Sequence, residues 1–289
     1  MSNLSDFTSL HNQSTDSKDI KLLVLDIDGT IAGNSNTLST TVKKVIAAVQ
    51  AKGIQVAIAT GRMYCSALRF HQEIASTLPL VAYQGAWIQD PNTHKIHRHF
   101  PVSREISRQL LEYFEQPHLR SLLSVHFYIN DQLHVREITK ETESYQERCG
   151  VTAIPVGDLR QVLDHEPTKI LALCDDVNLI QQLLANLRRQ YKPTELYMTT
   201  SVPSFLEAAN SFVNKGNAVR YLAEEMLGLE SHNVMTIGDN FNDVEMLGYA
   251  GIGVAMGDAP SEVQAIADWV APGVDADGAA VAMEKFLLS

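Results

Sequence analysis

Short apolar runs alternate with amphipathic segments over the first third of the chain. Residues 21–25 form an apolar run that ends at Asp26, and such a run bounded by turn residues is typical of a strand buried on both faces. Ser39 is placed to cap a helix and Gly53 to end it. The apolar positions of this helix are Val42, Val45, Ile46 and Val49. A second strand over residues 55–59 then completes a parallel βαβ unit with a right-handed crossover.

The pattern changes after a third strand at residues 80–83. From Gln84 onward the chain reads as hairpins and isolated helices, which is typical of an α+β arrangement. One hairpin is expected from residues 87–89 and 96–100, and another joins residues 125–130 to 133–136 across Asp131-Gln132. Further elements are a strand at residues 169–174 and a helix at residues 178–191.

The first pattern returns at Phe205. The expected elements are a helix at residues 215–227, a strand at 234–237, a helix at 243–247 and a strand at 251–254. The sequence therefore predicts an α/β fold whose core is a doubly wound, Rossmann-like parallel sheet, with an inserted α+β cap domain. The predicted divisions are a disordered leader at 1–18, a discontinuous core domain at 19–83 and 205–289, and the cap at 84–204.

Composition narrows the classes of partner. The chain has 289 residues and a formal net charge of -11, which argues against nucleic acid, whose binding proteins carry basic patches. No run approaches the roughly 18 consecutive apolar residues that a membrane span needs. Three widely spaced cysteines and a first segment without signal-peptide character indicate a reducing cytoplasm. We therefore expect a small-molecule partner, and the sequence indicates no oligomeric state.

The strongest chemical signal is Asp26-Ile27-Asp28-Gly29-Thr30, directly after a buried strand. Ligands of open parallel sheets bind beyond the carboxyl ends of the strands, where this turn lies. Two carboxylates two residues apart repel each other unless a cation or a shared proton relieves them, which indicates magnesium or acid-base chemistry. For the pentapeptide alone, an ordinary turn in which Asp and Gly suit the geometry is the competing interpretation.

Three further segments fall at strand ends of the same expected sheet. Thr60-Gly61-Arg62 follows the second strand, where a hydroxyl and a guanidinium can hold an anion. Lys215 begins a helix, whose N-terminus itself favours anions. Gly238-Asp239-Asn240-Phe241-Asn242-Asp243 adds two more carboxylates after another apolar strand. Separately each segment has an ordinary structural explanation, but their convergence on one sheet edge favours a catalytic site.

These segments resemble, in the same order, the four motifs of the haloacid dehalogenase-like hydrolases. The motifs are Asp26-x-Asp28-Gly-Thr, Thr60, Lys215 and Gly238-Asp239-x-x-Asn242-Asp243. The position of the insertion and Gln84-Gly85-Ala86 at its start resemble the Cof-type phosphatase branch, although Gln84 stands where that branch often has Asn.

The resemblance implies a role for each matching residue. Asp26 would be the nucleophile that forms an aspartyl-phosphate, and Asp28 the general acid and base. Mg²⁺ would be held by Asp26, the backbone carbonyl of Asp28, and Asp239, with Asp243 in support. The residues that would hold the phosphate and substrate are Thr60, Gly61, Arg62, Lys215 and Asn242. The implied function is a phosphatase of small phosphorylated metabolites such as sugar phosphates.

Three other functions remain open at this stage. A phosphotransferase or phosphomutase of the same superfamily would also form an aspartyl-phosphate, and it differs only in passing the phosphate to a second hydroxyl. A signalling receiver also phosphorylates an Asp near a Lys, but Asp28 as an acid-base group and the large insertion argue against it. A non-catalytic binding protein would not need the full set of motifs.

Overall fold

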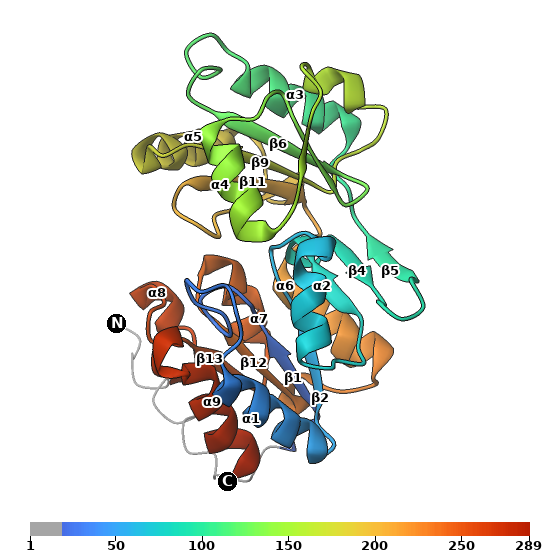
Figure 1. The fold of residues 1–289 in the computed structure, drawn as a ribbon, viewed down its shortest axis with the longest axis vertical. Coiled ribbons are helices and arrows are strands. Elements are labelled where there is room, and N and C mark those ends of the chain that lie inside the picture. Colours follow the sequence, from blue (N-terminus) through green and yellow to red (C-terminus); the bar gives the residue numbers. More distant parts are fainter. Residues whose placement is uncertain (1–18) are drawn as a thin grey trace, which may run out of the picture.

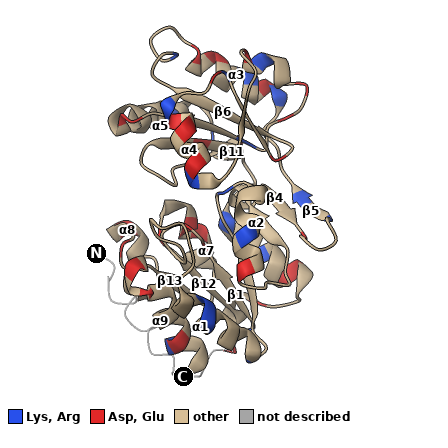
Figure 2. Ribbon diagram, in the orientation of Figure 1, with Lys and Arg blue, Asp and Glu red and all other residues tan. Residues whose placement is uncertain are grey.

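The computed structural model describes residues 19–289, so the leader predicted at 1–18 lies outside the described residues. The ribbon forms a lower lobe of red and blue elements and an upper lobe of green and yellow elements (Figure 1). Acidic and basic residues are interspersed over both lobes in this view (Figure 2). Among the described residues, no helix has both the length and the apolar character needed to span a bilayer.

The lower lobe is built on a parallel sheet with the strand order β14-β13-β12-β1-β2. Its strands are β1 (Leu22–Leu25), β2 (Gln55–Ile58), β12 (Val234–Gly238), β13 (Ile252–Ala255) and β14 (Trp269–Val270). Every residue of β1 is buried, and successive residues belong to different apolar clusters. Leu23 packs in the cluster that contains Val45, whereas Leu22 packs in the cluster that contains Val219. Helices therefore cover both faces, which confirms the doubly wound core.

The helices of the lower lobe begin and end where the sequence gives local reasons. The first helix is capped by Ser39, whose Oγ accepts from the N–H of Val42 at 3.0 Å, and it ends just before Gly53, which has φ +85°. The lobe's helices are α1 (Thr40–Ala51), α2 (Tyr64–Glu73), α6 (Lys215–Arg220), α7 (Val244–Tyr249), α8 (Ser261–Gln264) and α9 (Gly278–Met283). Single-turn π-helical segments continue α6 over Tyr221–Met226 and α9 over Glu284–Leu288.

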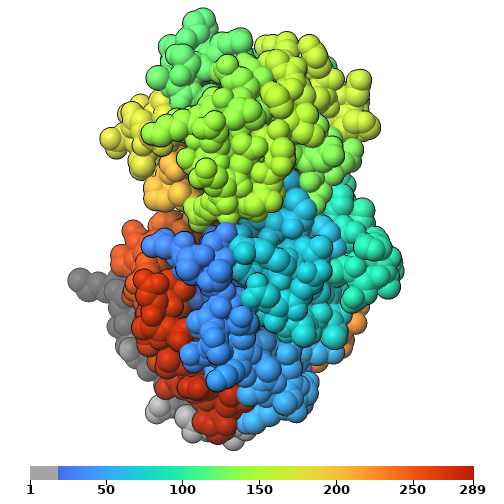
Figure 3. All heavy atoms as spheres, in the orientation of Figure 1, coloured from blue at the N-terminus to red at the C-terminus, as the bar shows by residue number. Residues whose placement is uncertain are grey.

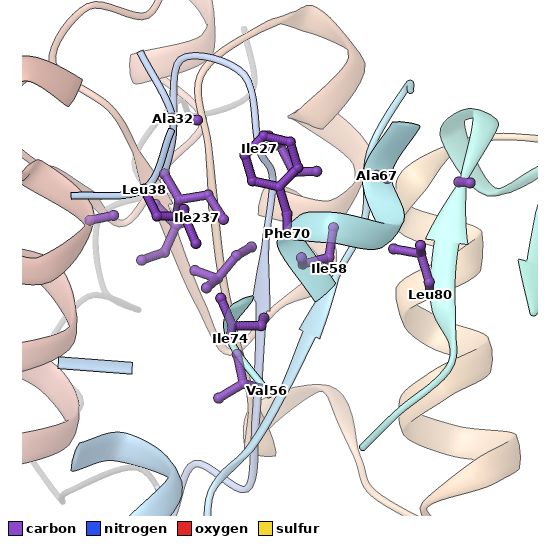
Figure 4. Close-up of a cluster of buried hydrophobic side chains, with 14 of the residues drawn as sticks. Ile27, Ala32, Leu38, Val56, Ile58, Ala67, Phe70, Ile74, Leu80 and Ile237 are labelled. Carbon is purple, nitrogen blue, oxygen red and sulfur yellow. The ribbon is translucent and has the colours of Figure 1, made fainter. Parts of the chain in front are cut away.

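The largest apolar cluster lies beside the loop that follows β1. Ile27, next to the catalytic candidates, packs among Phe70 of α2, Ile58 of β2 and Ile237 of β12 (Figure 4). All four side chains are buried. Burying large apolar side chains contributes roughly 1.5–3 kcal/mol each. The loop is therefore anchored by Ile27 while its flanking carboxylates point elsewhere.

The upper lobe is built on a six-stranded sheet with the order β10-β11-β9-β6-β7-β8. Its strands are β6 (Ser124–Ile129), β7 (Gln132–Val135), β8 (Ala153–Pro155), β9 (Lys169–Leu173), β10 (Leu196–Thr199) and β11 (Phe205–Asn210). The helices are α3 (Arg104–Phe114), α4 (Lys140–Cys149) and α5 (Val177–Gln190). All pairings are antiparallel except β7 with β8, as an α+β lobe requires.

Strand pairing differs from the predicted boundaries in two places. β11 pairs with β9 and β10, because its apolar residues bury against them, so it belongs to the upper sheet and not to the core. β3 (Leu80–Ala82), β4 (Trp87–Gln89) and β5 (Ile96–His99) form a separate three-stranded sheet. A bridge between Val81 and Ala59 joins this sheet to the core. Sheet membership thus favours boundaries near 100 and 211, and the division into separate domains stays a prediction.

The hairpin between β6 and β7 turns one residue earlier than predicted. Ile129 pairs with Gln132, which leaves Asn130 and Asp131 as the two turn residues. Both have positive φ, 52° and 57°, and Asn and Asp tolerate this left-handed conformation better than other residues with side chains. The tip of this hairpin reaches the lower lobe, where Asp131 accepts from the N–H groups of Tyr64 and Cys65.

The two lobes touch along their boundary in the space-filling view (Figure 3). Asn36 Nδ2 donates to the carbonyl of Arg148 at 2.7 Å, and Ser66 Oγ donates to the carbonyl of Cys149 at 2.5 Å. The end of α4 therefore lies directly on the lower lobe.

Candidate active site

Three strands of the core sheet deliver polar residues to one edge. Asp26 follows β1, Thr60 follows β2 and Asp239 follows β12. β1 lies between the other two and runs parallel to both, so the three carboxyl ends are neighbours. The convergence expected from the sequence is therefore present.

Lys215, at the start of α6, joins two of the carboxylates. Its Nζ lies 2.5 Å from Oδ1 of Asp26 and 2.5 Å from Oδ1 of Asp243, and all three residues are buried. Burial lowers the pKa of Lys215, but the two carboxylates outweigh it and raise the pKa above its ordinary value. Lys215 therefore stays charged and fixes the position of Asp26.

Asp26, Asp239 and Asp243 form a compact carboxylate cluster. One oxygen from each lies within 4.8 Å of the others. Burial raises the pKa of Asp26 to about 7 and that of Asp239 to about 9, and the neighbouring carboxylates add to both shifts. Buried like charges favour protonation unless a cation neutralises them. The donor set, all carboxylate oxygen, is the kind that hard divalent cations prefer.

Gly29 makes room for this cluster. It has φ +76°, and a Cβ at this position would collide with Oδ2 of Asp239. Asp243 is held in turn by its Oδ2, which accepts from the N–H groups of Asp239 at 2.9 Å and Asn240 at 3.1 Å. The backbone thus shapes a cradle around the carboxylates.

The side chain of Asp28 points away from the cluster and toward two arginines. Arg62 donates from Nε and Nη2 to the two oxygens of Asp28, both at 2.8 Å, and Arg148 donates to Oδ1 at 3.1 Å. Burial alone would raise the pKa of Asp28, but the hydrogen bonds and charges of the two arginines lower it to about 2. Asp28 is therefore held as a carboxylate. The remaining guanidinium nitrogen of Arg62, Nη1, is buried without a hydrogen-bond partner among the described residues.

The loop after β2 contacts the loop after β12 through Gln84. Oε1 of Gln84 accepts from Nδ2 of Asn242 at 3.1 Å, and a Cβ on Gly61 would collide with Nε2 of Gln84. Thr60 is buried, and its Oγ1 accepts from the N–H of Arg62 at 3.2 Å, which leaves its own proton available for an anion. Gln84 has φ 61°, an unusual backbone conformation for a residue with a side chain.

A cavity of about 50 Å³ lies between the lobes at this point. Seven of the predicted residues line it, namely Asp26, Asp28, Thr60, Gly61, Arg62, Asp239 and Asn242. Lys215 and Asp243 do not, because they lie buried behind Asp26.

The cavity wall also contains residues of the upper lobe that the sequence analysis did not identify. They include Tyr145, Arg148, Lys169, Ser201 and Glu207. The sequence contains an indication for Lys169 and Glu207, because each is a charged residue in a strand whose other residues are mostly apolar. Arg148 carried none, since it ends a helix rich in charged residues.

Comparisons with known proteins agree with this geometry. A family model described as haloacid dehalogenase-like hydrolase matches residues 23–283. A putative phosphatase of Haemophilus influenzae is 30% identical over 265 residues, covering 92% of this chain and 97% of the relative. A Bacillus subtilis protein named 5-amino-6-(5-phospho-D-ribitylamino)uracil phosphatase is 27% identical over 275 residues, with coverage of 92% and 97%.

A solved structure shares the fold. The haloacid dehalogenase-like hydrolase from Bacteroides thetaiotaomicron superposes with a TM-score of 0.80 at 24% identity, covering 92% of this chain and 99% of that one. The predicted fold class is thereby confirmed, including the parallel core and the additional antiparallel sheet.

Proposed function

The chain belongs to the haloacid dehalogenase-like hydrolases, in their Cof-type branch, and on that premise we propose that it is a Mg²⁺-dependent phosphatase of small phosphorylated metabolites. The observation that carries the proposal is the position of Asp26. Its carboxylate lines a cavity between the lobes, is held by Lys215, and belongs to a cluster of three carboxylates. An anionic nucleophile can approach an anionic phosphate only where cations offset their repulsion. Here Lys215 supplies one positive charge, and the carboxylate cluster can hold a divalent cation that supplies more.

The residues fit a magnesium ion. Asp26 and Asp239, with the backbone carbonyl of Asp28, would bind it, and Asp243 would support it by orienting the loop of Asp239. Gly29 leaves the space that such a site needs. When bound, the cation neutralises the charge between nucleophile and phosphate.

In the first step, an oxygen of Asp26 attacks phosphorus, the bond from phosphorus to the leaving oxygen breaks, and Asp28 gives that oxygen a proton. In the second step, Asp28 takes a proton from water, the water oxygen bonds to phosphorus, and the acyl phosphate bond breaks to release phosphate and Asp26. Asp28 as found here, ionised between Arg62 and Arg148, is in the state that the second step requires. Proton donation in the first step requires at least one of these arginine contacts to open.

Thr60, Gly61, Arg62, Lys215 and Asn242 would hold the transferring phosphate. Thr60 Oγ1 and Nη1 of Arg62 are donors without a current acceptor among the described hydrogen bonds, so both can turn to a phosphate oxygen. Asn242 would have to exchange its contact with Gln84 for one with substrate.

The substrate is small because the lobes close over the site. The cavity of about 50 Å³ holds only a few water molecules, since one water needs roughly 10–15 Å³ of such space. The upper lobe must therefore open to admit substrate and close before the chemistry. The relatives named as phosphatases of small phosphorylated compounds support this class.

The test is phosphate release from a panel of phosphomonoesters by purified protein, with Mg²⁺ and after chelation. We expect turnover of phenyl phosphate and of sugar phosphates with Mg²⁺, none after chelation, and little turnover of a phosphoprotein. A labelled phosphoryl group should appear on Asp26 after rapid quenching. Turnover without any divalent ion would contradict the proposal, and transfer of phosphate to an added sugar in preference to water would identify a phosphotransferase instead.

A further inference from the structure

A charged pair of the upper lobe faces the catalytic cavity. Lys169, the first residue of β9, and Glu207, in the middle of β11, are 4% and 2% exposed at their side chains, and Nζ of Lys169 lies 3.2 Å from Oε2 of Glu207. Both residues line the same cavity as Asp26 and Asp28. The pair therefore borders the space that the leaving group of a bound phosphoester would occupy.

Lys169 of the pair is connected to residues 60–62, the loop that follows β2, which we call the phosphate loop. Lys169 donates to the carbonyl of Gly61 at 3.0 Å, and Gln84 donates to Oε2 of Glu207 at 3.5 Å. Ser201 donates to Oε1 of Glu207. These contacts fix Lys169 against the loop that follows β2 and hold Glu207 between Gln84 and Ser201.

Stability alone does not explain this pair. A buried ion pair often contributes no more to the free energy of unfolding than well-packed apolar residues would, because both charges lose their hydration. The next residues on the same face of the two strands, Leu171 and Ala209, are apolar and buried. A function at the cavity accounts for two charges that the surrounding core does not need.

Both groups retain hydrogen-bonding capacity. An ammonium has three donors, and Lys169 uses two of them on Gly61 and Glu207. A carboxylate has about four acceptor positions, and the oxygens of Glu207 accept from three groups. One donor of Lys169 and one acceptor position on Oε1 of Glu207 therefore remain, and both residues line the cavity wall.

We propose that Lys169 and Glu207 bind a hydroxyl group of the leaving group, so that the enzyme selects phosphoesters of polyhydroxylated compounds. This inference rests on the proposed phosphatase function. A hydroxyl both donates and accepts, which matches the remaining acceptor of Glu207 and the remaining donor of Lys169.

The competing explanation is that the pair only holds the lobes together. In that case its removal would weaken turnover of every substrate alike. A hydroxyl-binding pair makes a different prediction, because a site built to hydrogen-bond a substrate hydroxyl disfavours the analogue that lacks it.

The experiment compares ribitol 5-phosphate with n-pentyl phosphate, which have the same carbon chain and differ in four hydroxyl groups, with phenyl phosphate as a reference. For the unaltered protein with Mg²⁺, we expect kcat/KM for ribitol 5-phosphate to exceed that for pentyl phosphate by about tenfold or more. Equal values, or turnover of phenyl phosphate alone, would overturn the inference and leave the phosphatase function standing. No turnover of any of the three would overturn both.

Glu207→Gln and Lys169→Met then assign the preference to the pair. Each should lower kcat/KM for ribitol 5-phosphate by about tenfold or more and change that for pentyl phosphate by less than about threefold. Glu115→Gln is the matched control, because Glu115 also forms an ion pair within the upper lobe, at 3.2 Å from Arg136, but does not line the cavity. An equal loss on all three substrates in a folded variant would assign the pair to lobe closure and overturn the inference.

Discussion

Nη2 of Arg148, at the end of α4, donates to Oδ1 of Asp28 at 3.1 Å, the same oxygen that accepts from Nη2 of Arg62 at 2.8 Å. One arginine belongs to the upper lobe and the other to the phosphate loop of the core. The carbonyl of Arg148 also accepts from Asn36 of the core at 2.7 Å. The position of the upper lobe is thus tied to the environment of the proposed acid-base residue.

We expect Arg148→Met to ease opening of the lobes. The side chains of Arg148 and Asp28 are 45% and 35% exposed, and ion pairs of this kind contribute about 0–1 kcal/mol. Amide hydrogen exchange in the core loop that contains Asn36 should therefore rise by up to about fivefold. Arg160→Met is the control, because Arg160 pairs with Asp158 on the surface of the upper lobe. Unchanged exchange in the loop would show that the pair does not contribute to closure.

The arginine contacts also predict a pH dependence of stability. The pKa of Asp28 falls from 3.8 to about 2 on folding, so its contribution to stability is complete above pH 3.8 and is lost as the pH falls through about 2. Asp28→Asn should therefore lower the free energy of unfolding at pH 7, and the difference from the parent should shrink as the pH falls below 3.8. Urea denaturation in the presence of chelator measures this. A difference that grows on acidification would contradict the assignment.

Magnesium should stabilise the protein as well as activate it. Neutralising the cluster of Asp26, Asp239 and Asp243 favours the folded state, which binds the ion, over the unfolded chain. At a free Mg²⁺ concentration of about 100 times Kd, binding adds about 2.7 kcal/mol to the free energy of unfolding. This should raise Tm by several degrees. Asp239→Asn should reduce this Mg²⁺-induced rise, whereas Asp268→Asn, outside the cluster, should retain it. The same Tm rise in Asp239→Asn would exclude the cluster as the metal site.

Asp26→Asn should abolish turnover while preserving the fold. The amide keeps the shape of the side chain but removes the anionic oxygen that attacks phosphorus, so kcat should fall by about 10³-fold or more. Burial and the neighbouring carboxylates raise the pKa of Asp26 despite its ion pair with Lys215, so loss of this charge should not lower Tm. Rapid-quench labelling should detect no phosphoprotein in the variant. A folded variant that retains about a tenth of the parent rate would show that Asp26 is not the nucleophile.

The core of the site was predictable because parallel strands bring their carboxyl ends to one edge. That rule placed Asp26, Thr60 and Asp239 together without knowledge of any contact. The contribution of Arg148 was not predictable, and the charge of Glu207 within its strand did not indicate which site it would line, because both depend on how the upper lobe rests on the core. Spacing within a segment specifies which face of that segment is apolar, but not which distant loop it will meet.

The sheet to which β11 belongs was not predictable for a related reason. β11 carries apolar residues that suit either sheet, and the pattern alone does not say which strands it joins. The hairpin at Asn130 and Asp131 was displaced by one residue because several polar residues there tolerate a turn, and only the pairing of Ile129 with Gln132 fixes the register.

The hairpin between β6 and β7 contacts α2 through Asp131. Asp131 accepts from the N–H groups of Tyr64 at 3.0 Å and Cys65 at 2.9 Å, and from the hydroxyl of Tyr83 at 2.7 Å. The residue before the helix, Met63, makes no side-chain capping bond, so a residue of the upper lobe caps a helix of the core.

Asp131→Ala should therefore destabilise the protein and disturb the phosphate loop together. Loss of the cap and of the partner of Tyr83 should lower the free energy of unfolding by about 1–3 kcal/mol. Since α2 begins two residues after Arg62, its fraying should also raise KM for phenyl phosphate. Asp158→Ala is the matched control, because Asp158 caps a short helix within the upper lobe, through the N–H of Arg160 at 2.9 Å, and should lower Tm without changing KM. If Asp131→Ala lowers Tm and leaves both KM and amide exchange at the start of α2 unchanged, the hairpin contributes only to stability and does not hold the phosphate loop in place.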